Sequence, residues 1–143
     1  MLYNKYLKKL KKCPFCNVDK SHILLSNKNA FVLLCRSPYT KDHLLVIPKK
    51  HVKFLNKLNT NEQDDLNKLM IKALNKLHKK HKNVSILYKE GVNKDVGKTI
   101  NHAHIHLIPR IKISIQDINW KKREVMCDKE YNKKTIEMKK ILK

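Results

Sequence analysis

Long apolar runs and acidic residues are both scarce in this chain of 143 residues. No apolar run approaches the roughly 20 residues that a membrane-spanning helix needs. Residues 1–12 alternate Lys with Leu and Tyr, so they lack the apolar centre of a signal peptide. We therefore expect a soluble, cytoplasmic protein with no membrane partner. The length suits one hydrophobic core and leaves too few residues for a second one.

The shortage of acidic residues makes the chain strongly basic. Only 12 Asp and Glu oppose 33 Lys and Arg, which gives a formal net charge of +21. The basic residues are almost all Lys, the exceptions being Arg36, Arg110 and Arg123. Because the Lys residues are spread along the whole chain, codon bias in an AT-rich genome explains them as well as a nucleic-acid-binding surface does. Under either interpretation an anionic ligand is attracted, and salt weakens the attraction.

Cysteine is too sparse for a disulfide framework. Of the four cysteines, Cys13 and Cys16 form a Cys-x-x-Cys pair, whereas Cys35 and Cys127 stand alone. In a chain without an export signal, such a pair indicates a metal site or redox chemistry.

The apolar pattern predicts an α+β fold. Short apolar runs bounded by turn residues predict five strands, at 23–26, 30–35, 43–48, 84–88 and 102–109. A short helical turn is expected at 52–58, and a long helix begins near Thr60, which forms a capping-box pattern with Gln63. The order β-β-β-α-β-β favours a mainly antiparallel sheet with one long and one short helix.

The chain ends are expected to lie outside this domain. We predict a basic N-terminal segment at 1–12, a domain at 13–115, and a basic C-terminal extension at 116–143 that is helical or disordered. The apolar periodicity of the extension is weak, so we expect it to be dispensable for catalysis. His78 and His81 lie at the Lys-rich end of the long helix and are expected to be solvated.

The most informative stretch is His-Ala-His-Ile-His at 102–106. A strand would place His102, His104 and His106 on one face, with the outer pair about 13 Å apart. One interpretation is a solvated polar face, and another is a metal shared by neighbouring histidines. Since one ion cannot bind all three, at least one imidazole is left for nucleophilic or proton-transfer chemistry.

Three motifs together resemble the histidine-triad (HIT) family of nucleotide hydrolases and transferases. They are His-x-His-x-His followed by two apolar residues, His-Leu-Leu-Val-Ile-Pro-Lys-Lys-His at 43–51, and Cys-Pro-Phe-Cys at 13–16. Their order and spacing fit the zinc-containing members over roughly residues 13–111. The resemblance implies a HIT-like fold, a nucleotide substrate and a homodimer.

The resemblance also implies roles for individual residues. The position of His104 is that of the nucleophile, which attacks the α-phosphorus and forms a nucleotidyl-histidine intermediate. His106 and Thr99 match positions that hydrogen-bond the phosphate, and His43 matches the histidine that joins the proton network.

A structural zinc ion, one per chain, is implied as well. Its ligands in the family correspond to Cys13, Cys16, His51 and His102. This Cys₂His₂ set is closed, so the metal would support the fold and leave no open position for a substrate.

The chain departs from the family at several positions expected to bind substrate. Many members carry an Asp near position 35 that holds the ribose hydroxyls, where this chain has Cys35 and Arg36. A glutamine usually follows the glycine matched by Gly97, but Lys98 stands here, and Lys89 stands where an asparagine is expected. The added lysines favour a more highly charged phosphate chain.

We therefore expect an enzyme that cleaves at the α-phosphate of a nucleoside phosphoramidate or a dinucleoside polyphosphate, as a hydrolase, phosphorylase or transferase. The alternative is a basic nucleic-acid-binding or scaffold protein on a HIT-like fold, for which the charge of +21 is itself the functional feature.

Overall fold

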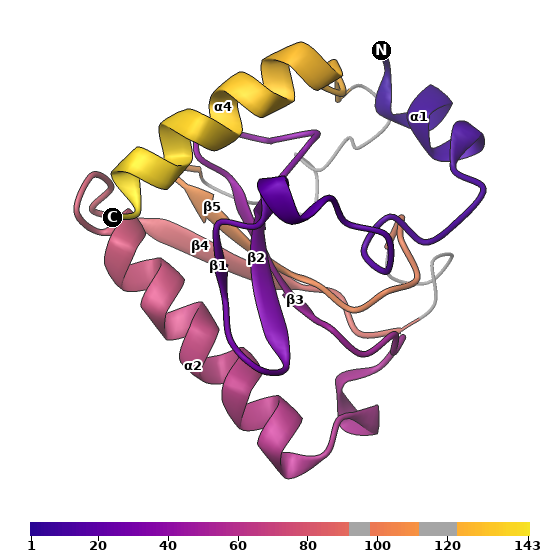
Figure 1. Ribbon diagram of the computed structural model, residues 1–143, viewed down its shortest axis with the longest axis vertical. Coiled ribbons are helices and arrows are strands. Elements are labelled where there is room, and N and C mark those ends of the chain that lie inside the picture. Colours follow the sequence, from indigo (N-terminus) through magenta and orange to yellow (C-terminus); the bar gives the residue numbers. More distant parts are fainter. Residues whose placement is uncertain (92–97, 112–122) are drawn as a thin grey trace.

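A single antiparallel sheet organises the protein (Figure 1). The structure, a computed structural model, describes residues 1–91, 98–111 and 123–143. Within these residues five strands lie in the order β1-β2-β3-β5-β4. Their bounds are Leu25–Ser26 for β1, Ala30–Leu34 for β2, Leu44–Pro48 for β3, Val84–Tyr88 for β4 and Ile105–Pro109 for β5.

Strand alternation gives the sheet two apolar faces. In β2, Val32 and Leu34 belong to one core cluster, whereas Phe31 and Leu33 belong to the other. Because successive side chains point to opposite faces, a continuous apolar run such as Ala30–Leu34 is buried on both sides. One face packs against helices and the other against the Cys-Pro-Phe-Cys segment through Phe15.

Helix α2 (Thr60–Leu77) covers the first of these faces. Leu66, Leu69, Ala73 and Leu77 are its buried residues, and they recur at the helical spacing that the sequence indicates. The capping box is formed by Asn59 and Glu62, one residue earlier than the predicted pair of Thr60 and Gln63.

Helix α4 (Asp128–Ile141) packs against β2 and contributes to the same core as α2. Tyr131, Met138 and Leu142 are buried in the same cluster as the α2 side chains. In Figure 1 the end of α4 reaches the C-terminal end of α2, where Lys76 Nζ donates to the backbone oxygen of Lys143 at 3.0 Å. The extension after residue 115 is therefore helical in this part, but it is built into the core instead of lying outside it.

The N-terminal segment also packs onto the protein. Helix α1 (Tyr3–Lys9) buries Tyr3, and the backbone at Leu2 pairs with Glu124 in an isolated antiparallel bridge. Two short 3₁₀ turns, at Lys20–His22 and Leu55–Lys57, complete the described helices. None of the described helices is both long and apolar enough to cross a membrane.

The predicted fold class and strand order are confirmed, and the difference in strand bounds that matters most for the site is in the last strand. Strand β5 begins at Ile105, so His102 and His104 precede it and only His106 lies within it. The three histidines therefore do not share one strand face as expected. The irregular backbone before β5 lets neighbouring imidazoles face different surroundings.

Candidate active site and metal centre

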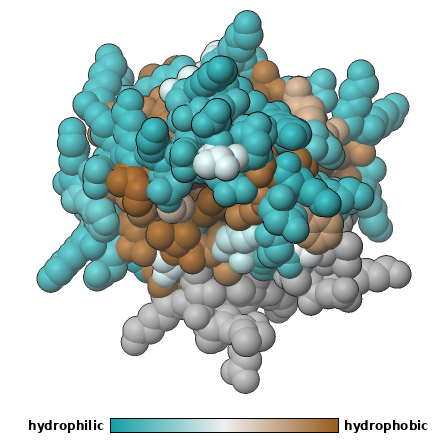
Figure 2. Space-filling view, turned by 90° about the horizontal axis from the view of Figure 1, so that it is seen from below, coloured by the Kyte–Doolittle hydropathy of each residue, from teal (hydrophilic) through white to brown (hydrophobic). Residues whose placement is uncertain are grey.

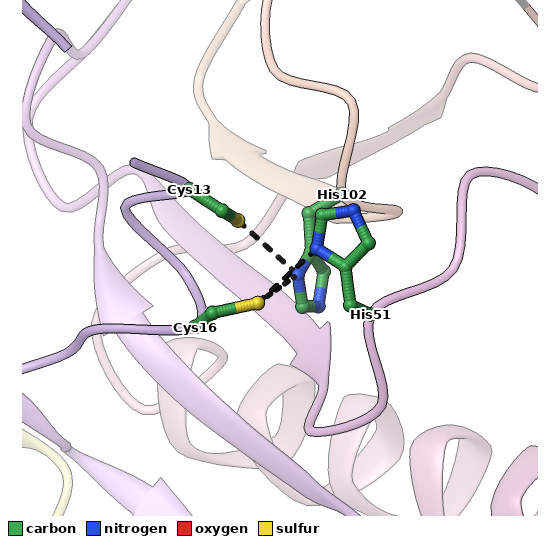
Figure 3. A group of neighbouring side chains, drawn as sticks. All are labelled: Cys13, Cys16, His51 and His102. Carbon is green, nitrogen blue, oxygen red and sulfur yellow. Dashed lines mark hydrogen bonds between the residues drawn. The ribbon is translucent and has the colours of Figure 1, made fainter. Parts of the chain in front are cut away.

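The first of the three histidines lies in a cluster with two cysteines and a second histidine (Figure 3). Cys13 and Cys16 come from the N-terminal knuckle, His51 from the segment after β3, and His102 from the segment before β5. One ligand atom from each lies within 4.8 Å of the others. The four predicted ligands are thus brought together and could hold a metal ion.

The distances within the cluster fit tetrahedral coordination. The Cys16 Sγ lies 3.1 Å from His51 Nδ1 and 3.5 Å from His102 Nδ1, and Cys13 Sγ is also 3.5 Å from His102 Nδ1. Zinc bound to sulfur and imidazole nitrogen at its usual bond lengths would separate such atoms by about 3.5 Å. On the other side of the His102 ring, Nε2 donates to the Pro48 carbonyl at 2.7 Å, which leaves Nδ1 free to bind a metal.

The middle histidine, His104, bonds a backbone carbonyl through Nδ1, whereas His102 does so through Nε2. Its Nδ1 lies 2.7 Å from the backbone oxygen of His102. Because a carbonyl oxygen only accepts, the neutral ring carries its proton on Nδ1 and its lone pair on Nε2. Phe15 packs edge-on against this ring, with the centroids 5.2 Å apart. The arrangement therefore holds the ring and leaves Nε2 able to react.

His43 and His106 form a hydrogen-bonded pair next to His104. The backbone N–H of Tyr39 donates to His43 Nδ1 at 3.1 Å, so neutral His43 carries its proton on Nε2. That nitrogen lies 2.9 Å from His106 Nδ1, which accepts the hydrogen bond, so neutral His106 carries its own N–H at Nε2. The His106 ring lies 4.9 Å from that of His104. An outward-facing donor therefore stands beside the His104 ring.

Burial keeps all three of these histidines neutral. Burial first, then the Arg123 and His104 charges, lower the pKa of His43 to about 3. Burial likewise lowers the pKa of His104 to about 4. Burial, followed by repulsion from His104 and His43, holds the pKa of His106 well below its ordinary value. Near neutral pH the lone pair of His104 is therefore not blocked by a proton.

The rings of His104 and His106 line a small hollow of about 20 Å³. Lys98 and Thr99, two of the predicted substrate-binding residues, line it as well. Lys98 is buried and its Nζ donates to the Lys53 carbonyl at 2.7 Å. Gly97, the third residue predicted from this loop, lies outside the described residues.

Cys35 and Arg36 line a different, much larger cavity of about 830 Å³, between β2, α4 and the knuckle. Burial raises the pKa of the Cys35 thiol to about 11. The Arg36 guanidinium lies over the Tyr131 ring at 4.7 Å and donates through Nη2 to the Asp128 carboxylate at 2.5 Å. The predicted substrate-binding residues are therefore divided between two neighbouring spaces, with Phe15 and Leu33 among the apolar walls of the larger one.

Sequence reasoning did not single out Tyr39, Leu87 and Arg123, which line the small hollow, or Tyr3 beside it. Arg123, from the C-terminal extension, lines the hollow. Tyr3, from the N-terminal segment, donates to or accepts from Thr99 Oγ1 at 2.7 Å. Arginine is rare in this chain, and that rarity is the one signal that singles out Arg123. Its presence argues against the expectation that the extension is dispensable for catalysis.

The prediction that His81 is solvated was wrong. Its side chain is buried, and Nε2 lies 2.6 Å from the Asp42 carboxylate. His81 follows the end of α2, where the chain turns inward, whereas His78 is exposed as expected. The contact fixes the turn that precedes His43.

Comparisons with known proteins agree with this geometry. The model of the HIT domain matches residues 17–113. The chain is 34% identical over 121 residues to the nitrilase and fragile histidine triad fusion protein NitFhit of Caenorhabditis elegans, covering 82% of this chain and 27% of that one. It is 28% identical over 116 residues to a bis(5'-adenosyl)-triphosphatase of Dictyostelium discoideum, covering 79% and 76%.

A solved structure extends the likeness to the fold. The zinc-bound histidine triad protein of Mycobacterium smegmatis superimposes with a TM-score of 0.67 at 19% identity, covering 92% of this chain and 93% of that one. The chain spans about a quarter of NitFhit and three quarters of the Dictyostelium protein. Because the domain model covers more than half of the chain, and the histidine motif lies within the matched segment, this protein belongs to the HIT-domain family.

Proposed function

We propose that this HIT-family protein is a nucleotide hydrolase or nucleotidyl transferase that uses His104 as its nucleophile. The observation that carries the proposal is the 2.7 Å contact between His104 Nδ1 and the His102 carbonyl, which leaves a neutral Nε2 beside the His106 ring. The substrate is a nucleoside phosphoramidate or a dinucleoside polyphosphate. The name of the Dictyostelium relative supports the second class.

The reaction then has two displacements at the α-phosphorus. The His104 Nε2 lone pair forms a bond to phosphorus, and the bond from phosphorus to the leaving oxygen or nitrogen breaks with its electron pair on the leaving atom. Water attacks the nucleotidyl-histidine in the second step, gives its oxygen to phosphorus and a proton to the medium, and returns the lone pair to Nε2. Another acceptor in place of water makes the enzyme a transferase or phosphorylase.

Neighbouring side chains are proposed to stabilise the negative charge on the phosphoryl oxygens. The Nε2–H of His106, held in that tautomer by His43, is proposed to donate to a phosphoryl oxygen. Thr99 and Lys98 are proposed to bind the same phosphate from the other side of the hollow. Gly97 is proposed to let the backbone approach the phosphate.

The large cavity beside the hollow is proposed to take the nucleoside. Its apolar walls suit a purine ring, and Arg36 lies at its edge. A buried Cys35 thiol offers no carboxylate to the ribose hydroxyls. We therefore expect weaker discrimination between ribose and deoxyribose than a carboxylate would give.

A zinc ion is proposed for the Cys13, Cys16, His51 and His102 cluster. Two sulfurs and two imidazoles at these separations suit tetrahedral zinc, which would tie three distant segments together. This donor set is closed, so the ion has a structural role and takes no part in the displacements.

A homodimer is proposed through the edge of the sheet. Within the described residues β4 pairs on one side only, with β5, and its Ile86 is 51% exposed. An unpaired edge that carries an exposed apolar residue is a ready site for a second copy. Size-exclusion chromatography with light scattering tests the assembly.

A cytoplasmic location remains a prediction.

A turnover screen tests the proposed activity. Purified protein is given a fluorogenic adenosine phosphoramidate, diadenosine triphosphate and diadenosine tetraphosphate, and products are separated by chromatography. Turnover of at least one substrate, with a mass shift of one nucleotidyl group on the peptide containing His104 after acid-free trapping, supports the proposal. Absence of turnover on all three, with intact folding, contradicts it.

The nucleic-acid-binding alternative makes a different prediction. On the face in Figure 2, hydrophilic residues cover much of the surface and are interspersed with apolar areas. RNA binding that falls steeply with salt and is unchanged by loss of His104 would favour that alternative.

A further inference from the structure

Arg123 lies at the hollow although it comes from beyond the segment that the HIT domain model matches. The backbone brings it there, because the Tyr3 N–H donates to the Arg123 carbonyl at 2.8 Å and the Leu2–Glu124 bridge follows directly. The N-terminal segment and residues 123–125 thus meet next to the hollow that His104 and His106 line.

The guanidinium of Arg123 is held between two aromatic rings. Its Cζ lies 4.1 Å from the centroid of Tyr39 and 4.6 Å from that of Tyr3. Nη1 donates to the Ser37 carbonyl at 2.9 Å. Arginine suits this place because its planar, weakly hydrated cation stacks on aromatic faces, which a lysine ammonium does less well. The side chain is therefore oriented before any ligand arrives.

The charge of Arg123 is not neutralised by a neighbour that the structure describes. No carboxylate in the described residues lies within 4 Å of it, whereas Arg36 is paired with Asp128. Its buried Nε also has no hydrogen-bond partner among those residues. An oriented cation with an unused buried donor is suited to an anionic acceptor.

Two lysines bring further positive charge to the same place. Lys89 and Lys98 line the hollow with Arg123, and no acidic side chain of the described chain lines it. Burial and then the Arg123 cation lower the pKa of Lys89, which indicates that these charges lie close enough to repel. An anion with more than one negative charge suits a hollow lined by these cations.

We propose, resting on the function proposed above, that Arg123 binds the phosphates of the leaving group and thereby selects dinucleoside polyphosphates over phosphoramidates. When His104 attacks, the bond from the α-phosphorus to the bridging oxygen breaks and the electron pair stays on the leaving phosphate. That group departs as a nucleoside phosphate carrying several negative charges. A phosphoramidate instead releases an amine, which needs a proton and gains nothing from a fixed cation.

The test compares the two substrate classes in matched variants. Arg123→Gln removes the cation at the hollow, and Arg110→Gln removes a cation from an exposed position away from it. We expect kcat/KM for diadenosine triphosphate to fall roughly 10- to 100-fold in Arg123→Gln, the range for a lost charged hydrogen bond. The phosphoramidate rate should change less than about 3-fold, and Arg110→Gln should match the natural protein on both substrates.

Other outcomes separate this inference from the proposed function. Equal losses on both substrates, or no loss on either, overturn the role of Arg123 while leaving the nucleophile in place. If the unaltered protein turns over neither substrate, the proposed function itself fails.

A second measurement covers the case in which Arg123→Gln does not fold. Inorganic tripolyphosphate should inhibit the unaltered enzyme competitively, and Arg123→Lys should weaken that inhibition while retaining part of it. Inhibition that is the same in both proteins overturns the proposal.

Discussion

His102 and His104 are two residues apart, yet a backbone carbonyl accepts a hydrogen bond from Nε2 of His102 and from Nδ1 of His104. The Pro48 carbonyl takes Nε2 of His102, so Nδ1 faces the two cysteines. The His102 carbonyl takes Nδ1 of His104, so Nε2 is left with the lone pair. The chemical difference between the metal centre and the hollow therefore arises from which ring nitrogen a carbonyl occupies, because both side chains are the same imidazole.

The largest effect is expected from replacing the proposed nucleophile. His104→Asn can still donate to the His102 carbonyl but has no ring nitrogen to attack phosphorus. We expect kcat to fall by at least about 10³-fold, the scale seen when a nucleophile is removed and binding remains. Steady-state kinetics measure this loss, while metal content and thermal midpoint should stay close to those of the unaltered protein. A near-normal rate would falsify the role of His104.

Replacing the other histidine should give the converse result. His102→Ala removes a proposed metal ligand, so we expect less than one zinc per chain and a thermal midpoint lower by at least about 5 °C. Elemental analysis and calorimetry measure the two quantities. Cys127→Ser is the matched control, since Cys127 is an exposed cysteine outside the cluster. If His102→Ala retains one zinc per chain and its full thermal stability, His102 is not a metal ligand and the contrast between the metal centre and the hollow fails.

Acid should destabilise the fold more through protonation of buried His43 than through ordinary surface groups. The pKa of His43 is lowered from 6.5 to about 3, mainly by burial. Between these values the unfolded chain binds a proton that the folded chain does not, so the free energy of unfolding falls as pH falls. We expect His43→Asn to reduce the slope of stability against pH between 6.5 and 5. Denaturant unfolding at several pH values measures the slope, and an unchanged slope contradicts the assignment.

The smallest effect should come from the hydrogen bond between Tyr3 and Thr99. Tyr3→Phe removes one partner of the 2.7 Å contact but keeps the ring that packs on Arg123. We expect kcat/KM to fall less than about 10-fold, with metal content unchanged, since a neutral hydrogen bond contributes about 1 kcal/mol. A loss as large as that of His104→Asn would mean that Tyr3 has a greater role than positioning Thr99.

The sequence predicted the sheet and the paired cysteines of the cluster because the relevant signals are local. Alternation in the strands, the periodicity of α2 and the spacing of the cysteines each depend on neighbours within a few residues. From the motif at 102–106 alone, a metal ligand and a nucleophile could not be told apart; the resemblance to the histidine-triad family gave each histidine its role, and those roles remain predictions. By contrast, its strand was predicted to begin three residues too early, since the apolar alternation extends back from Ile105 to Ala103, which lies before the strand.

What the sequence did not reveal depends on contacts between distant segments. Helix α4 has widely spaced apolar residues and many lysines, so its burial against the sheet was not visible in its own pattern. His81 and Asp42 are 39 residues apart and meet only once α2 has packed. Arg123 reaches the hollow for the same reason, because Tyr3 and Tyr39 come from separate parts of the chain.

The contact between the N-terminal segment and residues 123–125 has a consequence for biosynthesis. Leu2 pairs with Glu124, and the Val125 N–H donates to the Met1 carbonyl at 2.6 Å. The sheet can therefore assemble from residues 25–109 while this closure still waits for segments more than a hundred residues apart. Contacts of such high sequence separation form slowly. A nascent chain that ends before residue 123 would lack both Arg123, which lines the hollow, and the bridge between Leu2 and Glu124.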